Sequence, residues 1–328
     1  MPVLQLQSIS KTFEQHLVLN QIDFAVNKGE IVGLLGESGS GKSTLLRIAA
    51  GLVDADHGGR VLLGKKAIAT ASDCLIPGHA DIKIVHQEYS LSPLLTTREN
   101  IAYALRFYEK SYQKSRIDEL IALCQLEAVA NQTVKTLSGG EKQRTAIARA
   151  LAEHPRVLLL DEPFAHLDLP NRRRLSHSVR QLVTQMGIAC IFVTHDPVEA
   201  LSLSNRLGIL QNGTLIQLNT PERVYQHPRN AYVAQLTGEA NLLKVSFCKR
   251  HLGLLKLPIL EDGLALIRPE KWTVSTSNEG IAAQVESCVF RGMYYEISFR
   301  IAQHILIAHA QVSFLAKQRI FLQYKSIA

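Results

Sequence analysis

The sequence predicts an α/β fold with a parallel, doubly wound sheet, followed by a small all-β domain. Short apolar runs at Val157–Leu160 and Ile188–Val193 are typical of strands buried on both faces of a parallel sheet, and a helical segment near Pro170–Met186 separates them. A third apolar run, Ile31–Leu35, leads directly into a glycine-rich loop and then a helix. After Gly238 the sequence changes to short β-rich pieces divided by Gly, Pro and Asn.

The remaining N-terminal segments predict two antiparallel strands and a helical insertion. Val3–Phe24 alternates apolar and polar residues and has a polar break at Glu14–His16, as a strand pair with a turn would. Lys42–Gly51 has helical spacing. Pro93–Glu153 is expected to be a helical insertion, with its last helix beginning at the paired glycines and ending near Ala152.

These patterns predict two domains. We expect the first over residues 1–238, with a helical subdomain at about 93–153, and a barrel-like second domain over residues 239–328. The strands predicted for the second domain are Gly263–Ile267, Ile281–Phe290, Tyr294–Ile301, His304–His309 and Arg319–Tyr324.

Composition is typical of a globular protein of the cytoplasm. Hydrophobic residues make up 46% of the 328 residues, which is ample for two cores. No run approaches the ~18 apolar residues of a spanning helix, and the start of the chain lacks the layout of a signal peptide. The five cysteines are dispersed without a C-x-x-C spacing, so neither disulfides nor a zinc site is expected.

The net charge of +7 falls mostly on the C-terminal third of the chain. A basic surface can bind lipid or nucleic acid, but ordinary solvated Lys and Arg side chains are the preferred explanation. The run Arg172–Arg174 is likewise expected to be an exposed helical face.

One glycine-rich loop predicts a nucleoside triphosphate ligand. The sequence GESGSGKST fits G-x-x-x-x-G-K-[ST], in which backbone N–H groups surround phosphates, Lys42 supplies a positive charge and the hydroxyl of Ser43 binds Mg²⁺. A chance glycine-rich turn is the alternative, but the strand before the loop and the helix after it match the motif. The candidate nucleotide-binding residues are Gly36, Glu37, Ser38, Gly39, Ser40, Gly41, Lys42, Ser43 and Thr44.

An acidic pair follows the next buried strand. In LLLDEP, Asp161 is expected to face the metal and Glu162 the γ-phosphate side, where it would polarise water. Alone, such a pair is usually an exposed strand end. Its significance depends on the glycine loop in the same chain.

Two further motifs complete a resemblance to a known family. LSGGEKQR presents the hydroxyl of Ser138 and the N–H groups of Gly139 and Gly140 at a helix N-terminus, which makes a second phosphate-binding site. VTHD follows at Val193–Asp196. In this order, the four motifs resemble those of ATP-binding subunits of ABC transporters. The resemblance implies ATP and Mg²⁺ as ligands and a P-loop fold with antiparallel β and helical subdomains.

The resemblance also assigns roles to four other residues. His195 corresponds to the switch histidine that contacts the γ-phosphate, and Gln87 to a glutamine that senses Mg²⁺ and water, although an exposed loop amide would explain Gln87 too. Phe13 corresponds to the aromatic residue that stacks on adenine, with a core residue as the alternative. Asp168 lies in the loop that crosses the dimer interface. The family pairs two copies head to tail, so that each ATP lies between the Lys42 loop of one copy and the Ser138 loop of the other.

The C-terminal third resembles importers of the iron(III), polyamine and sulfate group. The segments that carry this resemblance are TGEANLL and LALIRPEKW, with Arg268, Pro269 and Glu270 in the second. In that group the final domain is an OB-like or TOBE barrel, which senses ligand, aids dimerisation or only stabilises the protein. Ala165–Asp168 departs from the usual family sequence, as do the residues around Gln87, which puts the identity of the partners in question.

The expected protein is the peripheral ATPase of an importer at the cytoplasmic face of the membrane. Its partners would be a second copy, transmembrane permease subunits and, indirectly, an extracytoplasmic solute-binding protein, with iron(III) favoured and polyamine or inorganic anions as alternatives. An ABC ATPase acting on nucleic acid is a distant alternative, because the chain has one cassette, no heptads and no zinc spacing. A structural protein that binds ATP without hydrolysing it is a further alternative, but the presence of both Glu162 and His195 argues against it.

Overall fold

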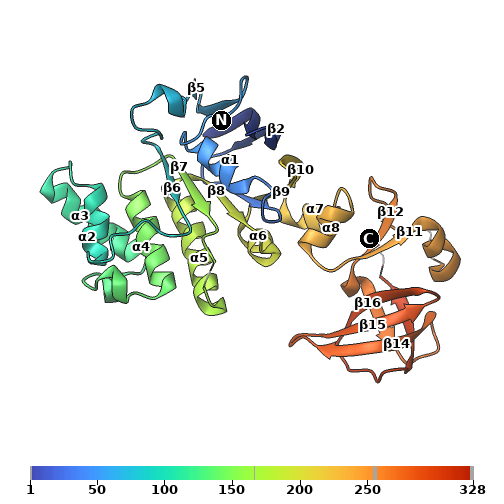
Figure 1. Ribbon diagram of the computed structural model, residues 1–328. Coiled ribbons are helices and arrows are strands. Elements are labelled where there is room, and N and C mark those ends of the chain that lie inside the picture. The colour runs from blue at the N-terminus through green and yellow to red at the C-terminus, as the bar shows by residue number, and fades with distance from the viewer. Residues whose placement is uncertain (1, 166, 254–256, 326–328) are drawn as a thin grey trace. The chain divides into compact units, whose positions relative to one another are not determined.

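The computed structural model describes residues 2–165, 167–253 and 257–325, so His166 lies outside the described residues. The chain divides into two compact units, Met1–Pro221 and Glu222–Ala328 (Figure 1). Among the described residues, no helix has both the length and the apolar character needed to cross a membrane.

A mainly parallel β-sheet forms the centre of the N-terminal unit. The predicted strands Ile31–Leu35, Val157–Leu160 and Ile188–Val193 all belong to it and pair in parallel, which confirms the predicted α/β fold. Within the part of this sheet that the structure describes, only its edge strand β10 runs antiparallel to its neighbour. In spatial order the strands are β10 (Thr214–Asn219), β9 (Arg206–Gln211), β3 (Ile31–Leu35), β8 (Ala189–Thr194), β7 (Val157–Asp161) and β6 (Ile82–Val85).

Helices connect the strands, and four of those named next begin at a residue whose side chain caps the helix. They are α1 (Lys42–Ala49), α2 (Thr97–Ala104), α3 (Lys110–Leu123), α4 (Gly139–Leu151), α5 (Leu169–Met186) and α6 (Pro197–Leu203). Thr96 and Ser138 each form a capping box with a glutamate three residues later, which fixes the start of α2 and of α4. Asp168 and Asp196 cap α5 and α6. The helices expected near residues 42–51, 139–152 and 170–186 are confirmed.

Strand β7 is buried on both faces of the sheet, which explains why its sequence is apolar up to Asp161. Leu158 and Leu160 belong to one hydrophobic core, whereas Val157 and Leu159 belong to another. The alternation follows from the two-residue period of a strand, and both faces are covered. Helix α1 contributes to one core and α5 to the other, and Figure 1 shows these helices on opposite sides of the sheet.

A second, antiparallel sheet packs against α1. Its strands β1 (Leu4–Phe13) and β2 (His16–Val26) form the predicted pair, with the turn at the predicted polar break. β1 also pairs with β4 (Arg60–Leu63), which in turn pairs with β5 (Lys66–Ala67). Buried residues of β1 and β2 share a core with α1, so this sheet supports the helix that follows the glycine loop.

The C-terminal unit is built around an antiparallel sheet. In spatial order the strands are β13 (Trp272–Ser275), β17 (Arg319–Tyr324), β14 (Ile281–Phe290), β15 (Tyr295–Ile301) and β16 (His304–Ala310). Trp272 and Phe299 meet edge to face in its core, with ring centroids 6.1 Å apart. The predicted strands are confirmed, and this half-barrel is consistent with the predicted OB-like domain.

A buried arginine ties two linking helices to the C-terminal unit. They are α7 (Pro221–Gln226) and α8 (Ala231–Thr237), which precede the strand pair β11 (Asn241–Lys244) and β12 (Leu264–Ile267). Arg268, which follows β12, donates to the carbonyls of Tyr225, Ala234, Gly238 and Glu239. The division between the compact units therefore falls at residues 221–222. The boundary predicted at residues 238–239 would place both helices in the first domain.

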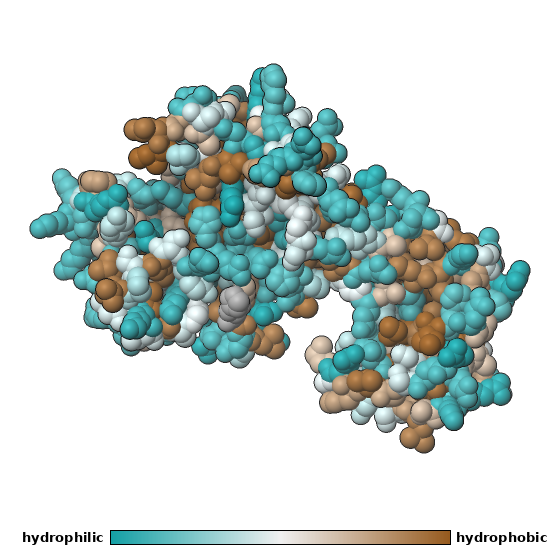
Figure 2. Space-filling view, in the orientation of Figure 1, coloured by the Kyte–Doolittle hydropathy of each residue, from teal (hydrophilic) through white to brown (hydrophobic). Residues whose placement is uncertain are grey.

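The face of the molecule in Figure 2 is mixed, with hydrophobic groups scattered among hydrophilic ones. Among the described residues, the most exposed large hydrophobic side chains include Leu75 and Phe107 in the N-terminal unit and Met293 in the C-terminal unit.

Candidate functional site

The sheet brings three motif segments to one edge. β3 and β7 both pair in parallel with β8, and Leu35 is aligned with Thr194 while Asp161 is aligned with Val193. The glycine loop after β3, the acidic pair at the end of β7 and His195 after β8 therefore meet at the carboxyl edge of the sheet, where α/β folds place their ligands. These three segments form the candidate site.

The glycine loop is shaped as an anion-binding site. Gly41, with φ of 98°, precedes α1, and no side chain caps the first N–H groups of that helix. A Cβ atom at Gly41 would lie 2.6 Å from Cδ2 of Leu19 and 2.8 Å from the carbonyl oxygen of Val18, so only glycine fits there. These N–H groups and the helix dipole suit a phosphate.

Lys42 lies beneath this loop with its side chain buried. Its Nζ donates to the carbonyl oxygens of Gly36 and Glu37, both at 2.8 Å, and to Oγ of Ser40 at 3.3 Å. Burial lowers the pKa of Lys42, and the neighbouring carboxylates of Glu162 and Asp161 act in the opposite direction. The ammonium group is thus held at the start of α1, where it supplements the positive end of the helix.

Two oxygen groups for Mg²⁺ are already side by side. Oγ of Ser43 donates to Oδ1 of Asp161 at 2.9 Å. Hydroxyl and carboxylate oxygens are the ligands that Mg²⁺ prefers, so the donor set fits the ion. Gln87 lies two residues beyond β6, which ends at the same sheet edge, and its side chain is exposed.

Glu162 and His195 form a pair next to the phosphate loop. Nδ1 of His195 and Oε1 of Glu162 are 3.2 Å apart. The backbone of Glu162 has φ of 47°, an unfavourable conformation for a residue with a side chain, and its N–H donates to the carbonyl oxygen of Val193 at 3.1 Å. This backbone turn directs the carboxylate toward His195 instead of continuing the strand.

Comparison with known proteins agrees with this geometry. The sequence model of the ABC transporter family matches residues 19–165. The ATP-binding cassette MJ0796, solved as a dimer in a post-hydrolysis state bound to ADP and Pi, is similar at 29% identity with a TM-score of 0.57 over 66% of this chain and 98% of that chain. The N-terminal unit contains an ABC transporter ATP-binding domain.

Two more distant structures share the ABC fold. One is cbiO1 from Clostridium perfringens, part of the ABC transporter complex cbiONQ, with 24% identity and a TM-score of 0.62 over 68% of this chain and 90% of that chain. The other is the ADP conformation of MJ1267, an ATP-binding cassette of an ABC transporter, with 24% identity and a TM-score of 0.63 over 72% and 98%. These two likenesses show the fold. The family match over residues 19–165 and the likeness to MJ0796 indicate an ATPase domain with ATP and Mg²⁺ as its ligands.

The segment predicted to be the second phosphate-binding motif lies at the start of α4. Oγ of Ser138 donates to Oε2 of Glu141 at 2.7 Å, and the backbone N–H of Ser138 donates to the same oxygen at 2.8 Å. These hydrogen bonds lower the pKa of Glu141. A Cβ at Gly140 would lie 3.4 Å from Cγ of Asn171, whose N–H donates to Asp168. The starts of α4 and α5 thus lie close together. Gly139 lies between Ser138 and Glu141, which form the capping box of α4.

Phe13, the predicted adenine-stacking residue, lies at the exposed end of β1. The side chain is 45% exposed, which excludes the alternative that it is a core residue. Nζ of Lys11 lies 5.1 Å from the ring centroid. A ring that binds a cation on one face can still offer stacking area to a purine.

The prediction that Arg172–Arg174 form an exposed face is wrong for Arg172. Its Nη1 lies 2.7 Å from Oδ2 of Asp196 and 3.2 Å from Oε1 of Glu199, which is buried. Arg173 and Arg174 are exposed, as expected. This contact could not be predicted from a local pattern, because it depends on how α5 packs against α6.

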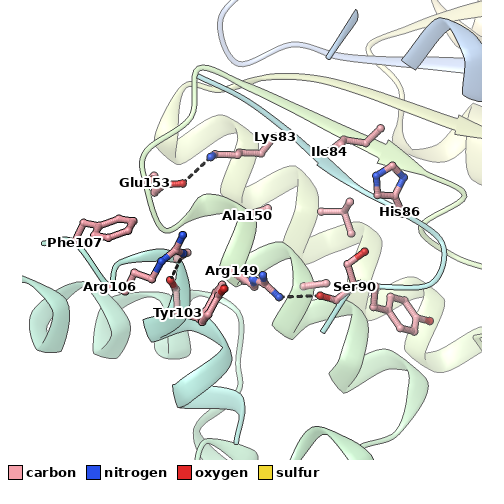
Figure 3. Close-up of a pocket in the computed structure, with 14 residues that line it drawn as sticks. Lys83, Ile84, His86, Ser90, Tyr103, Arg106, Phe107, Arg149, Ala150 and Glu153 are labelled. Atoms are coloured by element: carbon pink, nitrogen blue, oxygen red, sulfur yellow. Dashed lines mark hydrogen bonds and ion pairs between the residues drawn. The ribbon is translucent and has the colours of Figure 1, made fainter. Parts of the chain in front are cut away.

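A groove of about 430 Å³ lies between β6 and the helical segment of the ABC domain (Figure 3). Its walls carry aromatic and cationic side chains: the Arg106 guanidinium lies 4.5 Å from the ring centroids of both Tyr103 and Phe107. Arg149 on α4 donates to the carbonyl oxygen of Ser90 at 2.8 Å. The loop that contains Gln87 is therefore joined to the helix that begins after Ser138.

Proposed function

We propose that this chain is the ATP-hydrolysing subunit of an ABC importer, in which two copies close head to tail on two MgATP and drive solute uptake through separate membrane subunits. The observation that carries the proposal is the division of the phosphate-binding groups. Lys42, Ser43, Asp161, Glu162 and His195 share one sheet edge, whereas in the described residues the hydrogen bonds of Ser138 join it to Glu141. A second copy would supply the missing half of each site.

The geometry supports a specific division of labour in hydrolysis. Lys42 and the first N–H groups of α1 bind and orient the phosphates. Ser43 and Asp161, with Gln87 from the neighbouring loop, hold Mg²⁺, which neutralises developing charge when bound. Glu162 orients the attacking water and accepts its proton.

His195 supports Glu162 in this mechanism. Its Nδ1 lies 3.2 Å from the Glu162 carboxylate, which fixes the ring so that the opposite nitrogen is free to contact the γ-phosphate. The backbone conformation of Glu162 holds the pair in place before nucleotide binds.

The groove beside β6 supports the assignment to a transporter. Its volume and its exposed aromatic rings suit a short helix from a membrane subunit, because aromatic side chains supply large contact areas at interfaces. Phe107 is 85% exposed and Tyr103 is 49% exposed. A helix seated there would touch Arg149 on α4 and the loop of Ser90, so its movement would follow that of the Ser138 motif. The protein would then lie on the cytoplasmic face of the membrane.

Iron(III) is the solute that the C-terminal resemblance favours, with polyamines and inorganic anions as alternatives. Arg268 and Asn241, which belong to the segments that carry this resemblance, both make structural hydrogen bonds to backbone groups of the C-terminal unit. They therefore support a TOBE-like fold and do not themselves select a solute. Uptake of labelled iron and labelled putrescine in a deletion strain would decide between the leading solutes.

Replacement of Glu162 tests the mechanism. Glu162→Gln keeps the size of the side chain but removes the base, so we expect ATP binding with a loss of turnover of at least about a hundredfold. The variant should accumulate as an ATP-bound dimer in size-exclusion chromatography. Glu109→Gln, at an exposed position before α3, is the control and should behave as the unmodified protein. Normal turnover by Glu162→Gln would refute the assignment of the base.

A further inference from the structure

We infer that Arg172 is a positioning residue that couples the Asp168 loop to the His195 turn, so that a change at the proposed dimer interface reaches the catalytic pair. The inference rests on the roles proposed for Asp168 and His195. It concerns a residue that touches neither nucleotide nor metal in the site described above.

Arg172 binds the Asp168 loop from inside α5. Its backbone N–H donates to the carbonyl oxygen of Asp168 at 2.9 Å, in the first turn of the helix. Its Nη2 donates to the carbonyl oxygen of Leu167 at 3.2 Å. The guanidinium therefore follows the backbone just before Asp168, and a shift of that loop would move one of the acceptors of Arg172.

The same guanidinium binds the turn that presents His195. Nη1 of Arg172 contacts Oδ2 of Asp196 and Oε1 of Glu199, at 2.7 and 3.2 Å. Thr194 closes the arrangement, because its hydroxyl donates to Oε2 of Glu199 at 2.7 Å and accepts from the backbone N–H of Asp196 at 3.0 Å. Both neighbours of His195 in the chain are thus held by one hydrogen-bonded network.

The His195 ring lies outside the hydrogen bonds of this network. Its side chain is 60% exposed and pairs with Glu162, and it acts on Glu199 only through its charge. Arg172 therefore sets the position of the backbone at residue 195 and does not take part in the chemistry. A guanidinium suits this task because its rigid fork binds two carboxylates and a carbonyl at once.

Burial makes the arrangement sensitive to the loss of Arg172. Glu199 is buried, and burial raises its pKa, with Thr194 and Arg172 favouring the charged form and Asp196 opposing it. Without the guanidinium, the carboxylates of Asp196 and Glu199 would face each other with no cation between them. The turn would then move, or Glu199 would bind a proton.

The test is a double-mutant cycle on ATP turnover by the purified full chain. We expect Arg172→Gln to lower kcat by at least about tenfold, because small errors in the position of catalytic groups are costly, with the ATP dissociation constant unchanged in calorimetry. In a His195→Ala background the same substitution should cause almost no further loss. Arg174→Gln, an exposed change of equal charge on the same helix, should leave kcat and the unfolding temperature unchanged.

The outcomes separate this inference from the proposed function. If His195→Ala turned over ATP at the normal rate, the role of His195 would be wrong and the coupling would fall with it. If His195→Ala kept only a reduced, measurable turnover as expected but Arg172→Gln lost the same factor in both backgrounds, the coupling alone would be refuted. Arg172→Lys guards against misfolding: it keeps the charge but not the fork, so it should retain the unfolding temperature of the unmodified protein and recover part of kcat. No recovery with the fold intact would also count against the inference.

Discussion

Burial of Lys42 beneath the glycine loop sets the chemistry of the phosphate site. Its ammonium is held by the carbonyl oxygens of Gly36 and Glu37, and burial lowers its pKa while Asp161 and Glu162 favour the charged form. A buried cation next to two carboxylates needs an anionic ligand to balance the added charge when Mg²⁺ binds. Lys42 is therefore placed both to order the loop and to balance the charge of the phosphates that we propose bind there.

Removal of this cation is expected to weaken nucleotide binding directly. Lys42→Ala should lower the affinity for MgATP by at least about tenfold, because a hydrogen bond to a charged group contributes about 1.5–3 kcal/mol. Isothermal calorimetry measures the change. Lys66→Ala, at an exposed position of β5, removes the same charge without touching the loop and should bind normally. Equal affinity for the two variants would contradict the role of the loop.

At the scale of elements, α4 is fixed at both ends by specific side chains. Ser138 and Glu141 form the capping box at its start. At its end, Arg116 from α3 donates to the carbonyl oxygens of Leu151 at 2.7 Å and Ala152 at 3.3 Å. The Leu151 carbonyl also accepts from the backbone N–H of His154 at 3.2 Å, and Arg116 adds a charged donor to both carbonyls at the helix C-terminus.

Loss of Arg116 should therefore destabilise the N-terminal unit. Arg116→Met keeps much of the apolar stem but removes a charged donor from two carbonyl groups at a buried site and breaks the ion pair with Glu119, so we expect the free energy of unfolding to fall by about 2 kcal/mol in urea denaturation. The matched control is Arg98→Met, which breaks an exposed ion pair between α2 and α3 with Asp118. That change should cost less than about 1 kcal/mol. Similar losses for both variants would mean that the cap does not stabilise α4.

Sequence reasoning succeeded where a short motif determines its own surroundings. The strand, glycine loop and helix around Lys42 are contiguous, and Asp161 and Glu162 follow a buried strand, so periodicity placed them correctly at one sheet edge. Contacts between distant elements could not be predicted in this way. The ion pairs of Arg172 depend on α5 meeting α6. The hydrogen bonds from Arg268 to α8 likewise cross the domain boundary that was predicted from the change in composition after Gly238.

At the scale of the whole molecule, the two phosphate-binding motifs belong to different parts of the N-terminal unit. The Lys42 loop precedes α1, which packs in one hydrophobic core, whereas Ser138 begins α4, which packs in the other core with α5. Cores packed on opposite faces of a sheet do not rearrange readily, so one chain would have difficulty bringing both motifs to one nucleotide. The proposed closed pair of copies would solve this, since a two-fold axis uses each motif once per site.

Mixing two inactive variants tests whether each site is shared. Lys42→Ala should be inactive through its own loop, and Ser138→Asp through the motif it offers to a partner, since aspartate still caps a helix but repels phosphate. In a mixed pair, one site has the intact Lys42 of one copy and the intact Ser138 of the other, so mixing should restore turnover that neither variant shows alone. Mixing Lys42→Ala with Asp161→Asn, two defects in the same half, should restore none. Recovery in neither mixture, with dimers present, would place both motifs on the same nucleotide within one chain.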